Sequence, residues 1–512
     1  MARLTYTTGT PEQMSADFQE AIERLRTQVP EALPHRIGGQ TLARGPVLER
    51  RNPARTNEVV SRFHEGDATL IAEAIEVARE AQPDWEHRGF TERIAILRAG
   101  AAEIERRKVD LAAIVSLEVG KPRHEALAEV QESADIIYEY CRLAEEADGY
   151  VQRLGSLTDD ETNTSVLRSY GVFGVISPFN FPSALLTNMA GAALLAGNTV
   201  VAKPSDKATW SGVATLEALQ DGGLPAGVLN LVLGGAGTGE ALVDSDVDGM
   251  AFTGSVEVGR RIGEVMRSGP YGRPALMEMG GKNPTVVMPS ADLDAAAAGI
   301  ARSAFGLSGQ KCSACSRAIV HEDVHDDLLR RLSDFVAGLS VGDPTDEDHF
   351  LGPVADESAA QRFERSVQVA TRDGGDVVVG GERPVEGGHY VAPTVITGLP
   401  RGHELTVTEL FLPFLTVQKV ASLDEALELA NEVDHGLTAG IFSADDEELR
   451  EFVDRAQAGV LYLNRKAGST TGAWPGVQSF PGWKASGSTG KGGLGPWFVQ
   501  QYMREQCHTV VT

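Results

Sequence analysis

The sequence is poor in cysteine. Its four cysteines in 512 residues, Cys141, Cys312, Cys315 and Cys507, are too few and too scattered for a disulfide framework. Cys312 and Cys315 have the spacing of a CxxC pair, but a structural zinc site needs a second pair of ligands and the other two cysteines are isolated. We therefore expect no metal site.

Long apolar runs are also missing. No run approaches the roughly 20 residues that a membrane span needs. Residues 1–8 lack the apolar core of a signal peptide. These absences predict a cytoplasmic protein that does not associate with membranes.

Positive charge, and lysine above all, is scarce. Asp and Glu number 72 against 46 Lys and Arg, of which only 10 are Lys, and the net charge is −26. Such a surface repels nucleic acid and anionic lipid, which excludes both as expected partners. Because salt screens self-repulsion, the composition also suggests a cytoplasm of high salt concentration.

What is present points to an α/β protein of more than one domain. A chain of this length exceeds one ordinary core. The apolar spacing predicts a helix over residues 11–30 and a helical region over about 68–147, in three segments broken near Pro83 and at Gly120–Pro122, with most of its charges on a solvated face. From residue 171 strands and helices alternate, which predicts a parallel doubly wound sheet, and a second α/β region starts near residue 274.

Cys312 lies in an unusually polar stretch, residues 305–317, with two glycines around it. A core cysteine usually lies in an apolar run, whereas these surroundings suit a thiolate nucleophile with backbone N–H groups nearby. Alone, the stretch also fits a small residue in a loop.

Two further side chains are suited to chemistry. Glu278 precedes two glycines, and in a partly apolar pocket its pKa would rise, so that it could accept a proton from water. Asn180 is held between Pro178 and Pro182 and could donate its amide to a developing oxyanion. The alternatives are a surface glutamate and a turn-forming asparagine.

Three strand ends suggest a nucleotide site. In Phe252-Thr-Gly-Ser255, Gly254 admits another backbone and Ser255 can cap the next helix, whose N-terminus offers N–H groups to a phosphate. Lys203 and Asp206 end a neighbouring strand and suit ribose hydroxyls, with the carboxylate disfavouring a 2′-phosphate. The glycines of 234–239 are not a clean GxGxxG and fit an ordinary turn equally well.

Taken together and in order, these motifs resemble the NAD(P)-dependent aldehyde dehydrogenase superfamily from about residue 35 to the end. The set is Pro178-Phe-Asn180, Lys203-Pro-Ser, Phe252-Thr-Gly-Ser255, Glu278-Met-Gly-Gly-Lys282, Gly309-Gln-Lys-Cys312, Glu409-Leu-Phe411 and Lys484-Ala-Ser-Gly487. The resemblance implies a Rossmann-type NAD-binding domain (1–149 and 171–273, with 1–35 as a helical extension), an α/β catalytic domain (274–487) and a β-strand oligomerisation arm (150–170 and 488–512). It also implies a homo-oligomer built on a dimer.

The same resemblance implies roles for single residues. Cys312 attacks the aldehyde, Asn180 and the Cys312 N–H hold the oxyanion, and Glu278 activates the water that hydrolyses the thioester. The residues expected at the cofactor, NAD with NADP left open, are Ser177, Phe179, Lys203, Ser205, Asp206, Gly235, Gly254, Ser255, Glu409 and Phe411.

The catalytic stretch 310–317 and the loop 464–478 are similar to those of 1-pyrroline-5-carboxylate (glutamate γ-semialdehyde) dehydrogenases. That similarity implies glutamate γ-semialdehyde as the substrate, in proline or arginine breakdown. The substrate residues it implies are Ser313, Gly472, Ala473, Glu125 and Phe480. Other semialdehydes, such as those of succinate or 2-oxoglutarate, simple aldehydes, and a non-catalytic binding role remain as alternatives.

Some positions depart from the family pattern. Leu412 replaces a glycine and is expected to add bulk beside the cofactor ribose. Pro481 removes one backbone donor. Trp474 and Trp483 are expected to enlarge the aromatic lining of the substrate site.

Overall fold

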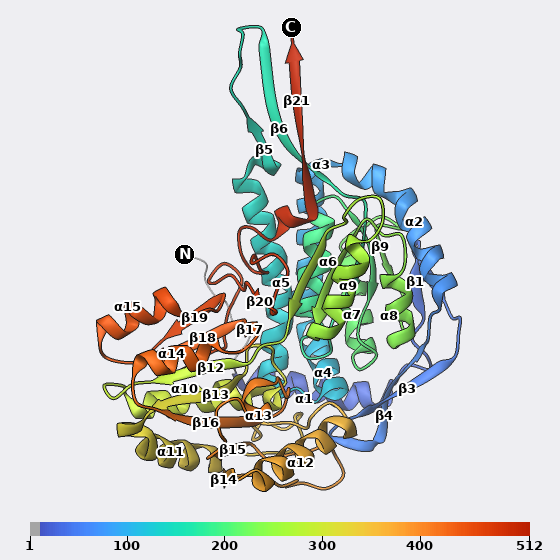
Figure 1. Ribbon diagram of the computed structural model, residues 1–512. Helices are drawn as coiled ribbons and strands as arrows, with labels where there is room; N and C mark the ends of the chain where they lie inside the picture. Colours follow the sequence, from blue (N-terminus) through green and yellow to red (C-terminus); the bar gives the residue numbers. More distant parts are fainter. Residues whose placement is uncertain (1–10) are drawn as a thin grey trace.

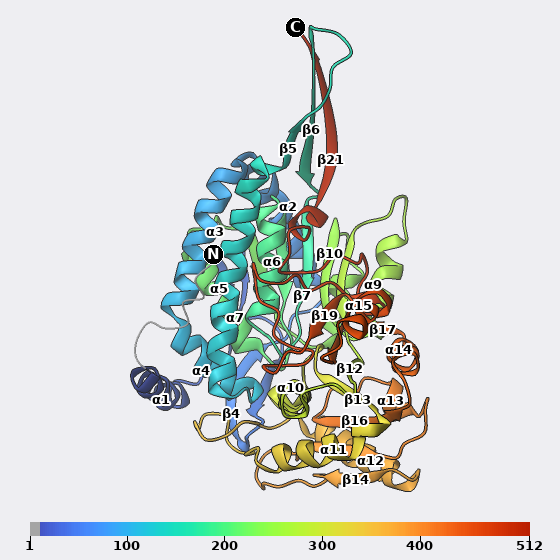
Figure 2. The same cartoon turned by 90° about the vertical axis from the view of Figure 1, so that its left-hand side faces the viewer.

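The computed structural model describes residues 11–512, which form two seven-stranded sheets and a projecting arm (Figures 1 and 2). The prediction that residues 1–8 do not form a signal peptide concerns residues outside the described part of the chain. No helix of the described chain is long and apolar enough to cross a membrane.

The first sheet is the doubly wound parallel sheet expected from the β–α alternation. Its strands run in the order β11-β10-β7-β8-β9-β1-β2, parallel from β11 to β9 and antiparallel at β1 and β2. The bounds are β1 His35–Ile37, β2 Gln40–Leu42, β7 Val172–Ile176, β8 Thr199–Lys203, β9 Leu229–Leu231, β10 Gly249–Gly254 and β11 Ala275–Met279.

Helices cover both faces of this sheet (Figure 1). One apolar cluster joins the sheet to α2 (Ala68–His87), α8 (Ala236–Val243) and α9 (Val256–Arg267). A larger cluster on the other face includes α3 (Gly89–Arg106), α4 (Lys108–Val119), α5 (Arg123–Glu146), α6 (Ala184–Leu195) and α7 (Thr209–Asp221). Within β8, Val200 and Ala202 enter the larger cluster and Val201 enters the smaller one, as the alternation of strand side chains requires.

The expected break at Pro83 was wrong. Pro83 lies inside α2, which continues to His87, and the region 68–146 holds four helices instead of three. The chain turns at Gly89, whose φ of 70° is left-handed and cheap only for glycine, and again at Arg107. Proline removes one backbone hydrogen bond, a loss that a long helix packed on a sheet can tolerate.

Most charged side chains of this helical region are exposed or half-buried, as expected, but some of them are fully buried. Glu118, Lys121 and Glu129 are at most 1% exposed. Glu118 accepts hydrogen bonds from the backbone N–H groups of Trp210 (2.8 Å) and Ser211 (2.7 Å) at the start of α7. Helical periodicity identifies an apolar face but not a carboxyl group that caps a neighbouring helix.

The second sheet has the order β14-β15-β16-β13-β12-β18-β19 and is parallel except at β14. Its strands are β12 Asn283–Val287, β13 Cys315–His321, β14 Asp376–Val379, β15 Thr394–Thr397, β16 Phe414–Val420, β18 Thr438–Phe442 and β19 Val460–Leu463. Its helices are α10 Leu293–Phe305, α11 Glu322–Ala337, α12 Glu357–Arg372, α13 Glu404–Val407, α14 Leu423–Asn431 and α15 Asp446–Arg455.

Smaller elements complete the chain. Helix α1 (Pro11–Thr27) packs on α4, and β3 (Val47–Asn52) pairs with β4 (Arg55–His64). β17 (His435–Gly436) pairs with β20 (Trp483–Lys484). The arm consists of β5 (Val151–Arg153), β6 (Glu161–Ser169) and β21 (Met503–Val511), with β6 in the middle, and it stands away from the body in both views (Figures 1 and 2).

Candidate active site

Two cavities meet at Cys312. The first, of about 650 Å³, lies at the carboxyl ends of β7, β8 and β10. The second, of about 270 Å³, lies between α5, the start of α6 and the loop 471–480. The Cys312 side chain lines both, so that a group bound in either cavity meets the thiol.

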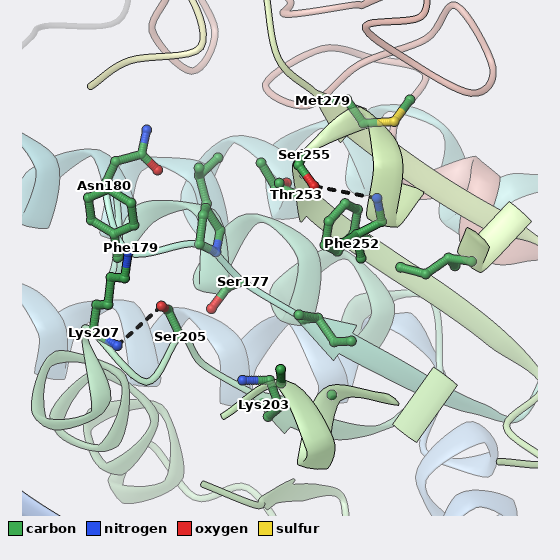
Figure 3. A pocket seen from close by; sticks show the side chains of 18 of the residues that line it. Ser177, Phe179, Asn180, Lys203, Ser205, Lys207, Phe252, Thr253, Ser255 and Met279 are labelled. Atoms are coloured by element: carbon green, nitrogen blue, oxygen red, sulfur yellow. Dashed lines mark hydrogen bonds between the residues drawn. The ribbon is translucent and has the colours of Figure 1, made fainter. Parts of the chain in front are cut away.

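The first cavity brings together every residue expected at a cofactor. Figure 3 looks into it, with Phe179 and Asn180 side by side and Lys203, Ser205 and Ser255 around the space. The predicted residues that line it are Ser177, Phe179, Lys203, Ser205, Asp206, Gly235, Gly254, Ser255, Glu409 and Phe411.

The start of α9 has the features of an anion site. Ser255 is the N-cap, and its Oγ accepts the Val258 N–H at 3.4 Å (Figure 3). A Cβ on Gly254 would lie 2.4 Å from the Phe252 ring, so only glycine fits between strand and helix. Ser255 and Val258 both line the cavity, so the N-terminal turn of this twelve-residue helix borders it.

Lys203 is buried at the end of β8. Its Nζ donates to the carbonyls of Pro204 (3.0 Å) and Gly234 (2.9 Å), and burial lowers its pKa to about 8. Asp206 is exposed at the rim of the cavity, next to Ser205. A buried ammonium with few partners and a rim carboxylate are both suited to hydroxyl groups of a ligand.

Glu409 lies at the other end of the first cavity. Its Oε1 accepts the Gly281 N–H at 3.0 Å, and burial raises its pKa to about 7. Phe411, at φ 58°, packs edge-on against Phe179 with ring centroids 6.0 Å apart. Leu412 was expected beside the ribose, but it is 4% exposed and packs into the apolar cluster of α12, β15 and β16, so it adds no bulk to the cavity.

The nucleophile candidate Cys312 follows a left-handed turn at the end of α10, where Leu307 and Ser308 have φ values of 49° and 52°. Asn283 on β12 fixes the loop by donating to the Cys312 carbonyl at 2.8 Å. Burial, together with the charges of Glu409 and Glu278, raises the pKa of the thiol to about 12. The resting residue is therefore a neutral thiol.

Asn180 and Glu278 lie on opposite sides of this thiol, one in each cavity. Asn180, 3% exposed, donates one Nδ2 hydrogen to the Gln310 carbonyl at 2.9 Å and lines the first cavity. Glu278 lines the second, accepts the Gly493 N–H at 2.7 Å, and has its pKa raised to about 7 by burial. A carboxyl group with this pKa is half ionised near neutrality, as a general base requires.

The second cavity brings together every residue expected at a substrate. These are Ser313, Gly472, Ala473, Glu125 and Phe480. Gly472 has a φ of 107°, and a Cβ there would lie 2.5 Å from the Arg465 guanidinium. A side chain at 472 would therefore adopt a strained backbone conformation and displace Arg465.

Three charged residues that line this cavity, Glu129, Glu132 and Lys311, were not anticipated from the sequence. Glu125, which was expected, is already paired with Lys311 at 2.9 Å and accepts the Leu307 N–H at 3.2 Å. Glu132 faces the same cavity but makes no hydrogen bond or ion pair with the described residues, and burial and the neighbouring Glu129 raise its pKa to about 8. Glu132 lies two helical turns after Glu125 on the same face of α5, but this relation points to the cavity only once the packing shows that Glu125 lines it.

Of the two tryptophans expected to line the substrate site, only one does so. Trp474 lines the second cavity and donates Nε1–H to Asp135 at 3.0 Å. Trp483 does not line it and is 46% exposed, because β20 pairs with β17 at the surface.

Cys315 is 1% exposed in the core beneath α10. Within residues 11–512 no group of three or more His, Cys, Asp or Glu side chains is arranged to hold a metal ion.

Known proteins match this chain over nearly its whole length. A model of the aldehyde dehydrogenase family matches residues 42–507. The 1-pyrroline-5-carboxylate dehydrogenase of Geobacillus sp. strain WCH70 is 37% identical over 496 residues, which cover 95% of this chain and 94% of that protein.

Solved structures match equally far. A mutant of the Thermus thermophilus 1-pyrroline-5-carboxylate dehydrogenase has a TM-score of 0.95 at 33% identity and covers 100% of this chain and 99% of its own. The structure of a 1-pyrroline-5-carboxylate dehydrogenase from Thermus with bound NAD has the same TM-score, 0.95, identity, 33%, and coverage, 100% and 99%.

Proposed function

Because the chain belongs to the aldehyde dehydrogenase family, we propose that it oxidises L-glutamate γ-semialdehyde to L-glutamate with NAD, in proline or arginine breakdown. One observation carries the choice of substrate. The cavity on the far side of Cys312 from the cofactor space combines an open backbone at Gly472 and Ala473 with an unpaired carboxyl group at Glu132. An α-carboxylate and an α-ammonium on one short aldehyde match these two features.

The first cavity fits a dinucleotide. The start of α9 suits the pyrophosphate, and the Glu409 carboxyl, buried with one backbone donor, has lone pairs left for ribose hydroxyls. Lys203 and Ser205 suit the second ribose, and the exposed Asp206 carboxylate disfavours a 2′-phosphate there, which favours NAD over NADP. A nicotinamide bound beside Phe411 would supply the oxidant for the aldehyde.

The reaction begins with the Cys312 thiol, which loses its proton to solvent and forms a C–S bond with the aldehyde carbon. The free Nδ2–H of Asn180 and the Cys312 backbone N–H stabilise the resulting oxyanion of the thiohemiacetal. After oxidation to the thioester, Glu278 takes a proton from an attacking water. The C–S bond then breaks, the carboxylic acid leaves, and the Cys312 sulfur regains a proton.

Substrate recognition follows from the second cavity. The backbone N–H groups of Gly472 and Ala473 and the Ser313 hydroxyl donate to the α-carboxylate. Glu132 balances the α-ammonium, and the ammonium in turn favours the ionised form of Glu132. Phe480 and Trp474 cover the carbon chain between these ends.

The test compares kcat/KM for glutamate γ-semialdehyde with kcat/KM for succinate semialdehyde, which lacks the ammonium. We expect a preference for the former of at least about 100-fold, and Glu132→Gln should reduce that preference by roughly tenfold while leaving the succinate value near wild type. Cys312→Ala should form no NADH with either. A preference for succinate semialdehyde or a simple aldehyde would replace the proposed substrate, and NADH formation by Cys312→Ala would end the catalytic assignment.

The assembly and location are also proposals. We infer a homo-oligomer built on a dimer, in which the arm adds its strands to a neighbour, because β5 and β21 leave their outer edges unpaired in one chain. The assignment of residues 1–149 and 171–273 to cofactor binding and 274–487 to catalysis is supported by the residues that line the two cavities. The low cysteine content supports a cytoplasmic location.

A further inference from the structure

Glu278 is held by a chain of hydrogen bonds that starts at Tyr140 on α5. Gly493 donates its N–H to Glu278 Oε1 at 2.7 Å. The next residue, Leu494, donates its N–H to the Tyr140 hydroxyl at 2.9 Å. That hydroxyl donates its own proton to Asn188 Oδ1 on α6. The Tyr140 hydroxyl therefore links two helices, α5 and α6, to the segment whose Gly493 N–H orients Glu278.

The segment that carries Gly493, residues 492–495, is also held by the Phe480 N–H, which donates to the Gly493 carbonyl at 2.9 Å, and by the buried Leu494 side chain. Three of its four residues, 492, 493 and 495, are glycines without side chains to pack. Leu494 adopts a φ of 65°, a conformation that is costly for a residue with a Cβ. A Cβ on Gly493 would lie 2.6 Å from Asn188 Nδ2, so the segment passes close against α6. The bond from Leu494 to Tyr140 ties this glycine-rich segment to α5, one residue away from the bond between Gly493 and Glu278.

We propose that Tyr140 is a positioning residue for the hydrolytic half of the reaction. By accepting the Leu494 N–H and donating to Asn188, it sets the Gly493 N–H against Glu278 and so directs the carboxylate toward the water that attacks the thioester. The inference rests on the proposed role of Glu278 as the base. Tyr140 lines neither cavity, so it acts through Gly493 and does not touch substrate or cofactor.

The surroundings of Glu278 leave Gly493 as its principal partner. Hydrogen bonding to the ionised form favours that form, so losing the Gly493 bond would raise the pKa of Glu278 further. The other titratable groups that face Glu278 or share a cavity with it are Cys312, Tyr140, Tyr502, Lys491, Lys311, Glu125, Glu129 and Glu132. Removing the Tyr140 hydroxyl changes no charge near pH 7 among these groups.

The test is Tyr140→Phe, which keeps the ring and its stacking on Phe498 at 5.8 Å. Rapid mixing with glutamate γ-semialdehyde and NAD should give a burst of NADH close to one per active site at the wild-type rate. Steady turnover should then be slower by about 10- to 100-fold, because thioester hydrolysis has become limiting. The pH profile of turnover, expected to show a pKa of about 7 in the wild type, should shift to higher pH.

Tyr502→Phe is the matched control. Tyr502 is equally buried, packs on the same Phe498 ring at 5.4 Å, and its hydroxyl has no hydrogen-bond partner among the described residues. It should show neither the burst nor the shift of the pH profile. Should Tyr140→Phe fail to fold, Asn188→Ala removes the acceptor that orients the same hydroxyl, and it should move the pH profile in the same direction.

Three results would overturn the proposal. They are wild-type turnover in Tyr140→Phe, an equal loss of burst rate and steady rate without a change in the pH profile, or the same effects in Tyr502→Phe. Glu278→Gln separates this inference from the one beneath it. If Glu278→Gln stops turnover while Tyr140→Phe behaves as wild type, the base stands and the positioning role falls; if Glu278→Gln still turns over, both fall.

Discussion

At the scale of single residues, the buried carboxyl group of Glu278, the proposed general base, should lower the stability of the fold. Burial raises the pKa of Glu278 from 4.5 to about 7. Below pH 4.5 the folded and unfolded chains both hold the proton. Between pH 4.5 and about 7 the unfolded chain ionises while the folded chain keeps its proton, so the free energy of unfolding falls as pH rises through this window and stays low above it.

At pH 8, Glu278→Gln should therefore be more stable than the wild type and melt at a higher temperature. The gain in the free energy of unfolding should be on the order of 2 kcal/mol, after allowing for water in the cavity. At pH 4.5 the two proteins should melt together. Thermal unfolding at both pH values measures this difference, and Glu264→Gln, on the exposed face of α9, is the control that should change neither value. Equal melting of wild type and Glu278→Gln at pH 8 would contradict the expectation.

The same scale shows what the sequence can and cannot identify. Cys312, Glu278 and Asn180 stand in short motifs with unusual neighbours, and the structure brings all three to one junction of cavities. Their individual roles remain predictions. Glu132 and Tyr140 sit in an ordinary helical pattern, where a glutamate is usually solvated and a tyrosine usually belongs to the core. Only the packing of the chain places one in a cavity and the other beneath Leu494.

At the scale of elements, the arm is a strand system without a complete core. β21 pairs with β6 over nine residues, from Met503 with Ser169 to Val511 with Glu161. Five apolar side chains in the strands of the arm and the β5–β6 connection are at least 39% exposed in the single chain: Val151, Leu154, Leu157, Val510 and Val511. Exposed apolar side chains beside free strand edges favour a neighbouring chain.

Deletion of residues 503–512 should therefore lower the molecular mass in solution to that of a smaller assembly or a monomer. The body should stay folded, since β21 contributes to neither large sheet. Sedimentation equilibrium gives the mass, and circular dichroism checks the fold. Val510→Asp with Val511→Asp should act in the same direction without shortening the strand. An unchanged mass in both variants would show that the arm does not join the chains.

Elements also differ in how well the sequence predicts them. The sequence predicts a helix over 293–305 and strands over 171–176 and 199–202. Helix α10 has those bounds and β7 and β8 differ from them by one residue, because buried strands and amphipathic helices have clear periods. The break at Pro83 was wrong because tertiary packing outweighed a local preference. β11 and β19 were not anticipated, and each is a short strand at the edge of its sheet.

At the scale of the whole molecule, the acidic composition acts through its sum. The net charge is −26, and four of the 10 lysines, Lys108, Lys121, Lys203 and Lys282, are buried, so the surface has fewer compensating lysines than the sequence suggests. Self-repulsion of such a surface destabilises the compact state, and its range shrinks from about 10 Å at 0.1 M salt to about 3 Å at 1 M.

The melting temperature at pH 7.5 should therefore rise with KCl between about 0.05 and 1 M, where screening changes most. Repetition at pH 5 is the internal control, because the isoelectric point is about 4.9 and little net repulsion remains to be screened. General salting-out would raise stability at both pH values alike. Full stability in dilute buffer at pH 7.5, or equal salt slopes at the two pH values, would contradict a fold adapted to high salt.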